Sequence, residues 1–304
     1  MNQRPYLQKK HKDLNFFYHF ILFSVFNLLI SGVIAQNKIV LPAILNENSG
    51  MVFSGDTIIW INDSGNRAEV ILTNKKGSLL KRVAIPANNR DWECIVQDNL
   101  GQIYIGDTGN NKSNFTNFNI YKLDKSFNFI DSISFSYPLS STSLSYDCEA
   151  MCWHQNSLHL FTKDKMNSAH KKACHFAIQP MASDSLSQLG CTSRFHPFFV
   201  TDATIHPDQK SLYILTYRYH KVWQILPDTD SRIYILDISK GMEKAFTQPI
   251  HYFTLPTFFT TRQYESMAFD RDGNLWIAAE KTAFLKPILK KVKIPRRFSL
   301  VRSR

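Results

Sequence analysis

The sequence predicts an all-β protein, a β-propeller with five recognisable four-stranded blades. A two-part motif recurs five times, and its anchoring aliphatic residues lie 44, 56, 54 and 62 residues apart. Apolar residues alternate with others on both sides of a short turn in each copy, which is typical of strand, tight turn and strand. No segment of helical periodicity and normal length follows residue 36. Four-stranded units at this period indicate a propeller, whereas a β-sandwich would not repeat one motif five times.

The first part of the motif is a small or acidic residue, then a small one, then an aliphatic one. The copies are Ser49-Gly50-Met51, Glu93-Cys94-Ile95, Glu149-Ala150-Met151 and Glu265-Ser266-Met267, with a looser copy at Asp202-Ala203-Thr204-Ile205. Eight or nine residues later an aromatic residue or a histidine stands within an apolar strand: Trp60, Tyr104, His159, Tyr213 and Trp276. Each copy therefore predicts the first two strands of a blade.

Further strands follow each pair. Third strands are expected at 69–77, 119–127, 175–182, 232–240 and 287–294, and fourth strands at 79–85 and 129–135. An unassigned strand at 38–45 precedes the first blade, and we expect it to complete the last blade and close the ring. The long interval before Glu265 leaves room for a sixth blade.

The N-terminus has the order of a secretory signal peptide. A polar and basic stretch precedes an uncharged run from Phe16 to Ala35, which ends in Val33-Ile34-Ala35. We expect cleavage after Ala35, a propeller domain over 36–294 and a solvated basic tail over 295–304. An uncleaved anchor helix is the alternative. No later segment is apolar for long enough to span a bilayer, so the mature chain is expected without a membrane span, in the periplasm or outside the cell.

The net charge of +11 lies at the two ends of the chain. Residues 1–35 carry four bases and one acid, residues 286–304 carry eight bases and no acid, and the middle carries 24 of each. A neutral middle argues against a nucleic-acid partner. The sequence also lacks the common dinucleotide, nucleotide-triphosphate, zinc-protease and serine-hydrolase motifs. We expect a monomer.

The cysteine count is odd, at five. Cys148 and Cys152 on one strand would be roughly 13 Å apart, too far for a disulfide. Cys174 and Cys191 flank a predicted hairpin and could pair. Five buried free thiols are the alternative.

Several short runs resemble those of exported bacterial β-propeller proteins, most of them uncharacterised. The runs are Asn62-Asp63-Ser64-Gly65-Asn66, Asp91-Trp92-Glu93, Asp107-Thr108-Gly109-Asn110, Glu149-Ala150 and Glu265-Ser266-Met267. At greater distance the blades look like those of NHL-repeat, gluconolactonase-like and phytase-like propellers. The resemblance implies a metal, often calcium, at the mouth of the channel.

Topology brings acidic residues to the same mouth. First strands should begin, and second strands should end, at one end of the propeller. The first strands begin with Glu93, Glu149, Asp202 and Glu265, and the second strands end at or near Asp63, Asp107, Asp164, Tyr217 and Glu280. Gathered carboxylates repel one another unless a proton or cation neutralises them, and hard oxygen ligands suit Ca²⁺ or Mg²⁺. We therefore predict a metal site formed by Asp63, Glu93, Asp107, Glu149 and Glu265. The asparagines at 62, 66, 110 and 111 could add neutral oxygens.

A purely structural role is the alternative, because Asp-Ser-Gly-Asn and Asp-Thr-Gly-Asn are also good turn sequences. The main functional prediction is an exported propeller that holds calcium and a small-molecule or protein ligand at its acidic mouth. A metal-dependent hydrolase of a phosphate ester or lactone is the first alternative, with Glu93, Glu149 or Asp107 as base. A protein-interaction platform is the second.

Overall fold

The computed structural model describes residues 38–138, 146–163, 171–180, 183–222, 226–256, 261–283 and 285–301. Residues 39–304 form one compact unit, and the segment before it lies almost entirely outside the described residues. The predicted signal peptide and the cleavage after Ala35 fall in that segment and stay predictions. In the described part of the chain, no helix has the length and apolar composition needed to cross a membrane.

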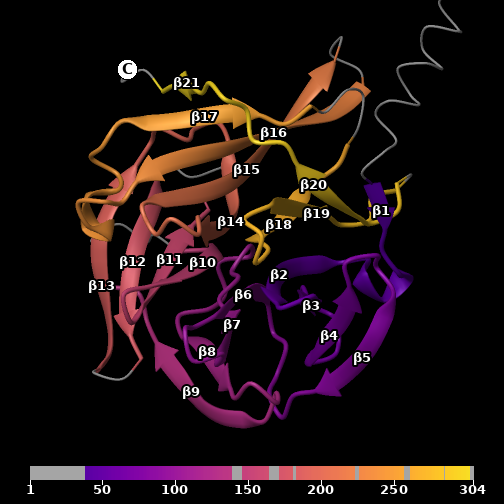
Figure 1. Ribbon diagram of the computed structural model, residues 1–304. Coiled ribbons are helices and arrows are strands. Elements are labelled where there is room, and N and C mark those ends of the chain that lie inside the picture. The colour runs from indigo at the N-terminus through magenta and orange to yellow at the C-terminus, as the bar shows by residue number, and fades with distance from the viewer. Residues whose placement is uncertain are drawn as a thin grey trace, which may run out of the picture. The chain divides into compact units, whose positions relative to one another are not determined.

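Five antiparallel sheets form the blades of a β-propeller, as the repeat predicts (Figure 1). Blade 1 contains β2 (Asn48–Ser54), β3 (Thr57–Asn62), β4 (Glu69–Asn74) and β5 (Leu79–Ala84). Blade 2 contains β6 (Trp92–Gln97), β7 (Ile103–Asp107), β8 (Phe118–Leu123) and β9 (Phe129–Phe135). Blade 3 contains β10 (Cys148–His154), β11 (Ser157–Thr162), β12 (Ala173–Gln179) and β13 (Ser183–Thr192).

Blade 4 contains β14 (Phe199–Ile205), β15 (Ser211–Val222), β16 (Leu226–Asp237), β17 (Ile250–Thr254) and β21 (Ser299–Leu300). Blade 5 contains β18 (Tyr264–Phe269), β19 (Leu275–Ala279), β20 (Ile288–Val292) and β1 (Lys38–Val40). The first strand of each blade contacts the first strands of both neighbouring blades, so β2, β6, β10, β14 and β18 form a closed ring around the channel (Figure 1).

The chain closes the ring with its N-terminal strand, as expected, because β1 pairs with β20. This strand is shorter than the sequence predicts: Pro42 has no amide hydrogen to donate, and a 3₁₀ turn, η2 (Ala43–Leu45), follows it. The described residues hold no sixth blade. The long interval before Glu265 is instead occupied by β15 and β16, of 12 residues each, and by the 3₁₀ turn η3 (Met242–Lys244).

The C-terminal segment, predicted as a solvated basic tail, includes a short exposed strand. Ser299 and Leu300 form β21, which pairs with β17 on the outer edge of blade 4, and the Val301 amide donates to the Ile250 carbonyl at 2.8 Å. An edge strand with unpaired backbone groups attracts a partner strand, and here the chain supplies its own.

Each seam between neighbouring blades has its own apolar core. Trp92 and Ile95 pack with Ile59 and Ile61 between blades 1 and 2, and four similar clusters fill the other seams. The second strands bring large side chains to these cores, with Trp60 and Tyr104 almost fully buried. Aromatic and branched side chains interdigitate at all five seams, which requires apolar residues at alternating positions along the strands.

Of the two predictions for the cysteines, the structure confirms the pairing of Cys174 with Cys191. Cys174 and Cys191 form a disulfide between the neighbouring strands β12 and β13. Cys94, Cys148 and Cys152 are free thiols, and all three are buried.

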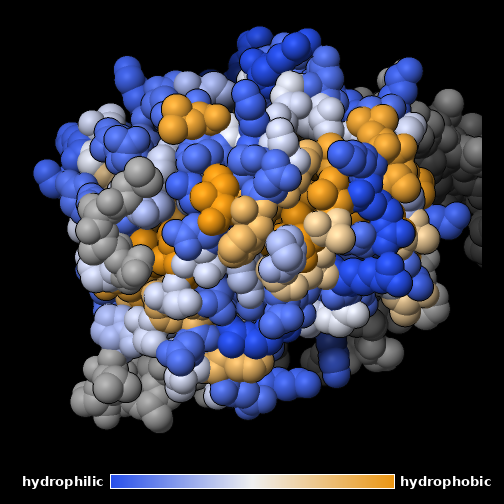
Figure 2. Space-filling model, turned by 90° about the horizontal axis from the view of Figure 1, so that it is seen from below, coloured by the Kyte–Doolittle hydropathy of each residue, from blue (hydrophilic) through white to orange (hydrophobic). Residues whose placement is uncertain are grey.

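The outermost strands of blades 1 and 2 expose several apolar side chains. Figure 2 views the protein from below Figure 1 and shows hydrophobic residues in orange among hydrophilic ones in blue. Leu79 and Leu80 on β5, and Phe129 and Ile130 on β9, are among the exposed residues. These strands are the farthest in their blades from the channel.

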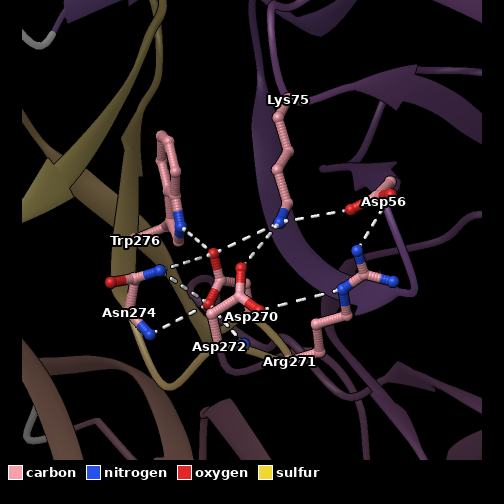
Figure 3. A network of polar contacts seen from close by, with 7 residues as sticks. All are labelled: Asp56, Lys75, Asp270, Arg271, Asp272, Asn274 and Trp276. Carbon is pink, nitrogen blue, oxygen red and sulfur yellow. Dashed lines mark hydrogen bonds and ion pairs between the residues drawn. The ribbon is translucent and has the colours of Figure 1, made fainter.

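A polar network joins blade 1 to blade 5 at the closure seam (Figure 3). The buried Asp270 carboxylate accepts hydrogen bonds from Trp276 Nε1 at 3.0 Å, from Asn274 Nδ2 at 3.1 Å and from Lys75 Nζ at 3.3 Å. Burial alone would raise the Asp270 pKa, but these hydrogen bonds outweigh it and lower the pKa to about 2. The seam therefore holds an ionised carboxylate.

We expect Asp270→Asn to destabilise the protein by about 1–3 kcal/mol at neutral pH, because it removes the charge and replaces one acceptor oxygen with an amide group that faces partly buried donors. A carboxyl group with a lowered folded-state pKa stabilises above its unfolded pKa of about 4, and this contribution is lost as the pH falls toward about 2. Denaturant titrations of both proteins at several pH values measure the difference. A difference that does not shrink in acid would contradict this account.

Candidate functional site

A β-bulge occurs near the start of all five inner strands. In each blade the pairing between the first two strands shifts by one residue, and the extra residues are Ser49, Glu93, Glu149, Thr201 and Glu265. A bulge leaves one residue out of the regular ladder and re-aims its side chain. Three of the five bulged residues are glutamates, so one structural device presents three carboxylates at the same end of the propeller.

The bulged serine and threonine have a structural role. Ser49 Oγ donates to the Trp92 carbonyl at 2.7 Å, and Thr201 Oγ1 donates to the Tyr264 carbonyl at 3.0 Å, in each case across to the next blade. An ionised glutamate cannot donate in this way. The glutamates at the other three bulges therefore depend on other groups for neutralisation.

Asp202 was expected to begin the first strand of blade 4 as Glu93, Glu149 and Glu265 begin theirs, and this equivalence is off by one residue. The bulged residue is Thr201, and Asp202 pairs with Leu215 in the regular ladder. Its carboxylate accepts hydrogen bonds from the backbone amides of Ala203 and Met267, so it joins blade 4 to blade 5.

The second strand of each blade brings one more residue to this end of the propeller. On the inner strands, the residue just before each bulge pairs with Asn62, Asp107, Thr162, Thr216 or Ala279 of the second strand. The next residues along the chain are Asp63, Thr108, Lys163, Tyr217 and Glu280. Three of these match the sequence prediction. Asp107 lies one residue before the equivalent position, and Asp164 lies outside the described residues.

Three carboxylates meet where blades 1 and 2 adjoin. Asp63, Asp91 and Glu93 each offer an oxygen atom, and these oxygens lie within 4.8 Å of one another. Asp91 is 8% exposed and Glu93 is 6% exposed. Two residues of this cluster, Asp63 and Glu93, belong to the predicted metal site.

Two side chains fix the backbone that carries this cluster. Asn89 Nδ2 donates to the carbonyls of Asn62 and Asp63 at 2.9 and 3.0 Å, which holds the loop of blade 1 against blade 2. Asp107 Oδ1 accepts the amides of Arg90 and Asp91 at 3.2 and 2.7 Å. Asp107 therefore positions Asp91 through the backbone, and its carboxylate is engaged there.

Gly109 leaves space for the cluster. A Cβ atom added to it would lie 2.5 Å from Asp91 Oδ2 and 2.6 Å from Glu93 Oε1. Any side chain at this position would push against both carboxylates. The glycine of the Asp-Thr-Gly-Asn run therefore leaves space beside the two carboxylates, because it has no side chain.

Burial and repulsion from neighbouring carboxylates raise the pKa values of Asp91 and Glu93. Burial raises the pKa of Asp91 to about 6, and the nearby charge of Asp63 adds to this shift. Burial, followed by the charges of Glu149 and Asp63, holds the Glu93 pKa well above its usual range. Without a cation, the three groups cannot all be ionised without a cost in stability.

Lys163 neutralises the neighbouring part of the mouth. Its ammonium lies 3.0 Å from Glu149 Oε1, and the side chains of Lys163 and Glu149 are 15% and 6% exposed. Burial disfavours the charged lysine, but the attraction of Glu149, Tyr217, Glu93 and Glu265 outweighs this and raises its pKa well above the usual range. The mouth is therefore divided into a half with its own internal cation and a half, at Asp63, Asp91 and Glu93, where three carboxylates converge.

Blades 4 and 5 bring another carboxyl group and two tyrosines to the mouth. Burial, and then the charge of Glu265, raise the pKa of Glu280 to about 8. Tyr217 and Tyr219 pack edge to face with ring centroids 5.1 Å apart, and Tyr219 is 49% exposed. A polar cavity of about 690 Å³ lies beside Asp63 and is lined by Glu47, Asn62, Asn66 and Lys281 among others.

Sequence reasoning missed two residues of the site. Asp91 stands two residues before Glu93 in a run that carries the family resemblance, and the same spacing relates Asp147 to Glu149. Lys163 occupies the position equivalent to Asp63. The other predicted site residues, Glu149 and Glu265, lie with Lys163.

Comparisons with known proteins give the fold. No family model matches the chain, and no curated protein matches it. A glucose dehydrogenase structure is similar with a TM-score of 0.50 at 7% identity over 86% of this chain and 100% of that chain. A streptogramin B lyase (0.42, 11%, 84% and 97%) and the NanB sialidase from Streptococcus pneumoniae (0.45, 9%, 74% and 35%) are also similar. At such identities the likeness shows a β-propeller and leaves the chemistry to the residues of the site.

Proposed function

We propose that this chain is an exported β-propeller protein that binds a calcium ion at Asp63, Asp91 and Glu93 and a ligand beside it. The observation that supports this proposal is the convergence of three carboxylate oxygens within 4.8 Å. Calcium takes six to eight oxygen ligands at about 2.3–2.6 Å and favours sites with several carboxylates. A calcium ion would offset the mutual repulsion of these three carboxylates.

Two further features fit a cation. Gly109 leaves a space beside Asp91 and Glu93 that a Cβ atom would fill. Asn62, next to Asp63, has a buried Oδ1 atom without a hydrogen-bond partner, although its Nδ2 donates to the Ile44 carbonyl at 2.7 Å. A buried amide oxygen is a ligand that calcium accepts. Asn110, by contrast, uses its side chain to hold the backbone of Phe115 and Tyr146.

The ligand would occupy the polar cavity beside Asp63, where Glu47, Asn66 and Lys281 offer hydrogen-bonding groups. A bound calcium ion leaves coordination positions that protein oxygens do not fill, and a ligand oxygen could take one of them. The metal-dependent hydrolase of a phosphate ester or lactone and the protein-interaction platform stay predictions.

Thermal unfolding in EDTA and in millimolar Ca²⁺ tests the proposal. A ligand present at 100 times its dissociation constant stabilises the folded state by about 2.7 kcal/mol. We therefore expect Ca²⁺ to raise the melting temperature by about 5–10 °C. Calorimetric titration should give one calcium ion per chain.

Gly109→Ala is the sharpest variant for this test, because it keeps every carboxylate and changes only the space between them. We expect it to weaken calcium binding by at least about tenfold. Asp131→Asn is the control, since it removes an exposed carboxylate on β9. Equal melting temperatures of the wild type in EDTA and in Ca²⁺, or equal calcium affinity of Gly109→Ala and wild type, would contradict the proposal.

A further inference from the structure

The channel changes character along its length. The inner strands that present the bulged residues at one end present another equivalent set four residues later: Phe53, Gln97, Trp153, Ile205 and Phe269. Carboxylates gather at the first end, and aromatic, aliphatic and amide side chains gather at the second. The two ends are thus suited to different ligands.

These five residues line a cavity of about 330 Å³ at the second end of the channel. All five blades contribute to its lining, and Met51, Ile95 and Met267, each two residues after a bulge, are buried between the two ends. Pockets for small molecules commonly measure about 300–1,000 Å³. The cavity therefore has room for one small molecule.

The aromatic walls are supported from behind by other rings. Trp153 stacks on Tyr104 with ring centroids 5.5 Å apart and an interplanar angle of 13°. Phe53 packs on Trp276 at 6.1 Å, and Phe269 packs on Tyr213 at 5.2 Å. Each of the three lining rings remains half-buried. Rings held in this way form preorganised surfaces for stacking.

The charged groups of the lining already have partners. Figure 3 shows Asp270 with Lys75 and Arg271 with Asp56, at 3.3 and 3.4 Å. Asp202 accepts two backbone amides. A charged ligand would lose its hydration without gaining a counter-charge, whereas an uncharged ligand would not.

We propose that this cavity binds an uncharged ring molecule whose faces are apolar and whose edge carries hydrogen-bonding groups. The faces stack on Phe53, Trp153 and Phe269, and the edge groups meet the side-chain amides of Gln97, Asn99 and Gln209, which also line the cavity. Neutral sugars and nucleosides both have this chemistry. The proposal is independent of calcium, because its residues lie at the other end of the inner strands.

The test is ligand-observed NMR and calorimetry in EDTA, with glucose, N-acetylglucosamine and maltose in one arm and adenosine and cytidine in the other. We expect at least one of these compounds to bind. Its charged counterpart, glucuronate for the sugars or a nucleoside monophosphate for the nucleosides, should bind at least about tenfold more weakly. Binding in the sugar arm or in the nucleoside arm shows which of the two classes of compound the cavity takes.

Two variants locate the binding. Trp153→Ala removes a wall, and Gln97→Leu removes an amide at similar volume, together with its 3.2 Å hydrogen bond to the Gly101 carbonyl. Both should weaken binding at least about tenfold. Leu100→Ala, which changes an exposed side chain outside the cavity, and Asp131→Asn, on the exposed strand β9, should leave binding unchanged. Absence of binding in both arms, loss of binding in Leu100→Ala or Asp131→Asn, or full binding by Gln97→Leu would overturn the proposal.

Discussion

Asp91→Asn will stabilise the calcium-free protein and abolish its response to calcium. In EDTA at neutral pH the substitution removes one of three converging carboxylates, and the Asp91 pKa of about 6 shows that ionisation is disfavoured there. We expect a gain of about 1–2 kcal/mol, which is less than the full pKa shift corresponds to, because solvent at the mouth screens part of the repulsion. In Ca²⁺ the sign reverses, because the wild type gains a bound ion and the variant does not.

The pH dependence of this effect has a definite sign. The folded-state pKa of Asp91 is higher than its unfolded value of about 4, so the stabilisation that protonation gives is present at low pH and is lost as the pH rises from about 4 to about 6. In EDTA the advantage of Asp91→Asn should therefore be small near pH 4 and complete at neutral pH. Melting curves at several pH values measure it. A variant less stable than wild type in EDTA at neutral pH would contradict the account of the cluster.

Lys163→Met will have the largest effect on stability. The substitution leaves Glu149 buried without its cation, which lies 3.0 Å away in the wild type. Breaking a buried ion pair by removing one partner costs about 3–5 kcal/mol. Denaturant titration at neutral pH should show this loss. Acid should reduce the loss, because the raised pKa of Glu149 allows it to take up a proton.

A double variant separates the lost charge from lost packing. Adding Glu149→Gln to Lys163→Met removes the unpaired charge, so the double variant should recover at least about half of the lost stability. Lys81→Met, on the exposed face of β5, is the control and should change stability by no more than about 0.5 kcal/mol. Equal stability of the single and double variants would show that Glu149 does not depend on Lys163 for its charge.

The fold could be predicted from sequence because the repeat is a property of single blades. The buried Trp60 and Tyr104 and the alternation around them arise from local strand geometry, which every blade shares. The ring-closing strand could also be inferred, since the last blade lacks a fourth strand of its own. The β21 strand could not, because two residues that pair across the edge of blade 4 leave no periodic signal.

The site was harder to predict because its residues depend on register. A bulge adds one residue to a strand, so spacing alone cannot tell Thr201 from Asp202, or Thr108 from Asp107. Lys163 was missed for another reason. An acidic mouth suggests acids at every equivalent position, and only the three-dimensional arrangement shows that one position carries a cation.

The pairing of β1 with β20 determines when folding can finish. The two strands stand near opposite ends of the chain, and β2 meets β18 across a comparable separation. Until residue 292 has left the ribosome, the last seam has no partner for its apolar face, and such distant contacts form slowly. The ring of blades therefore stays unclosed through most of the synthesis of the chain. That delay suits the export that residues 1–35 predict, because an unfinished ring can still be threaded through a narrow channel.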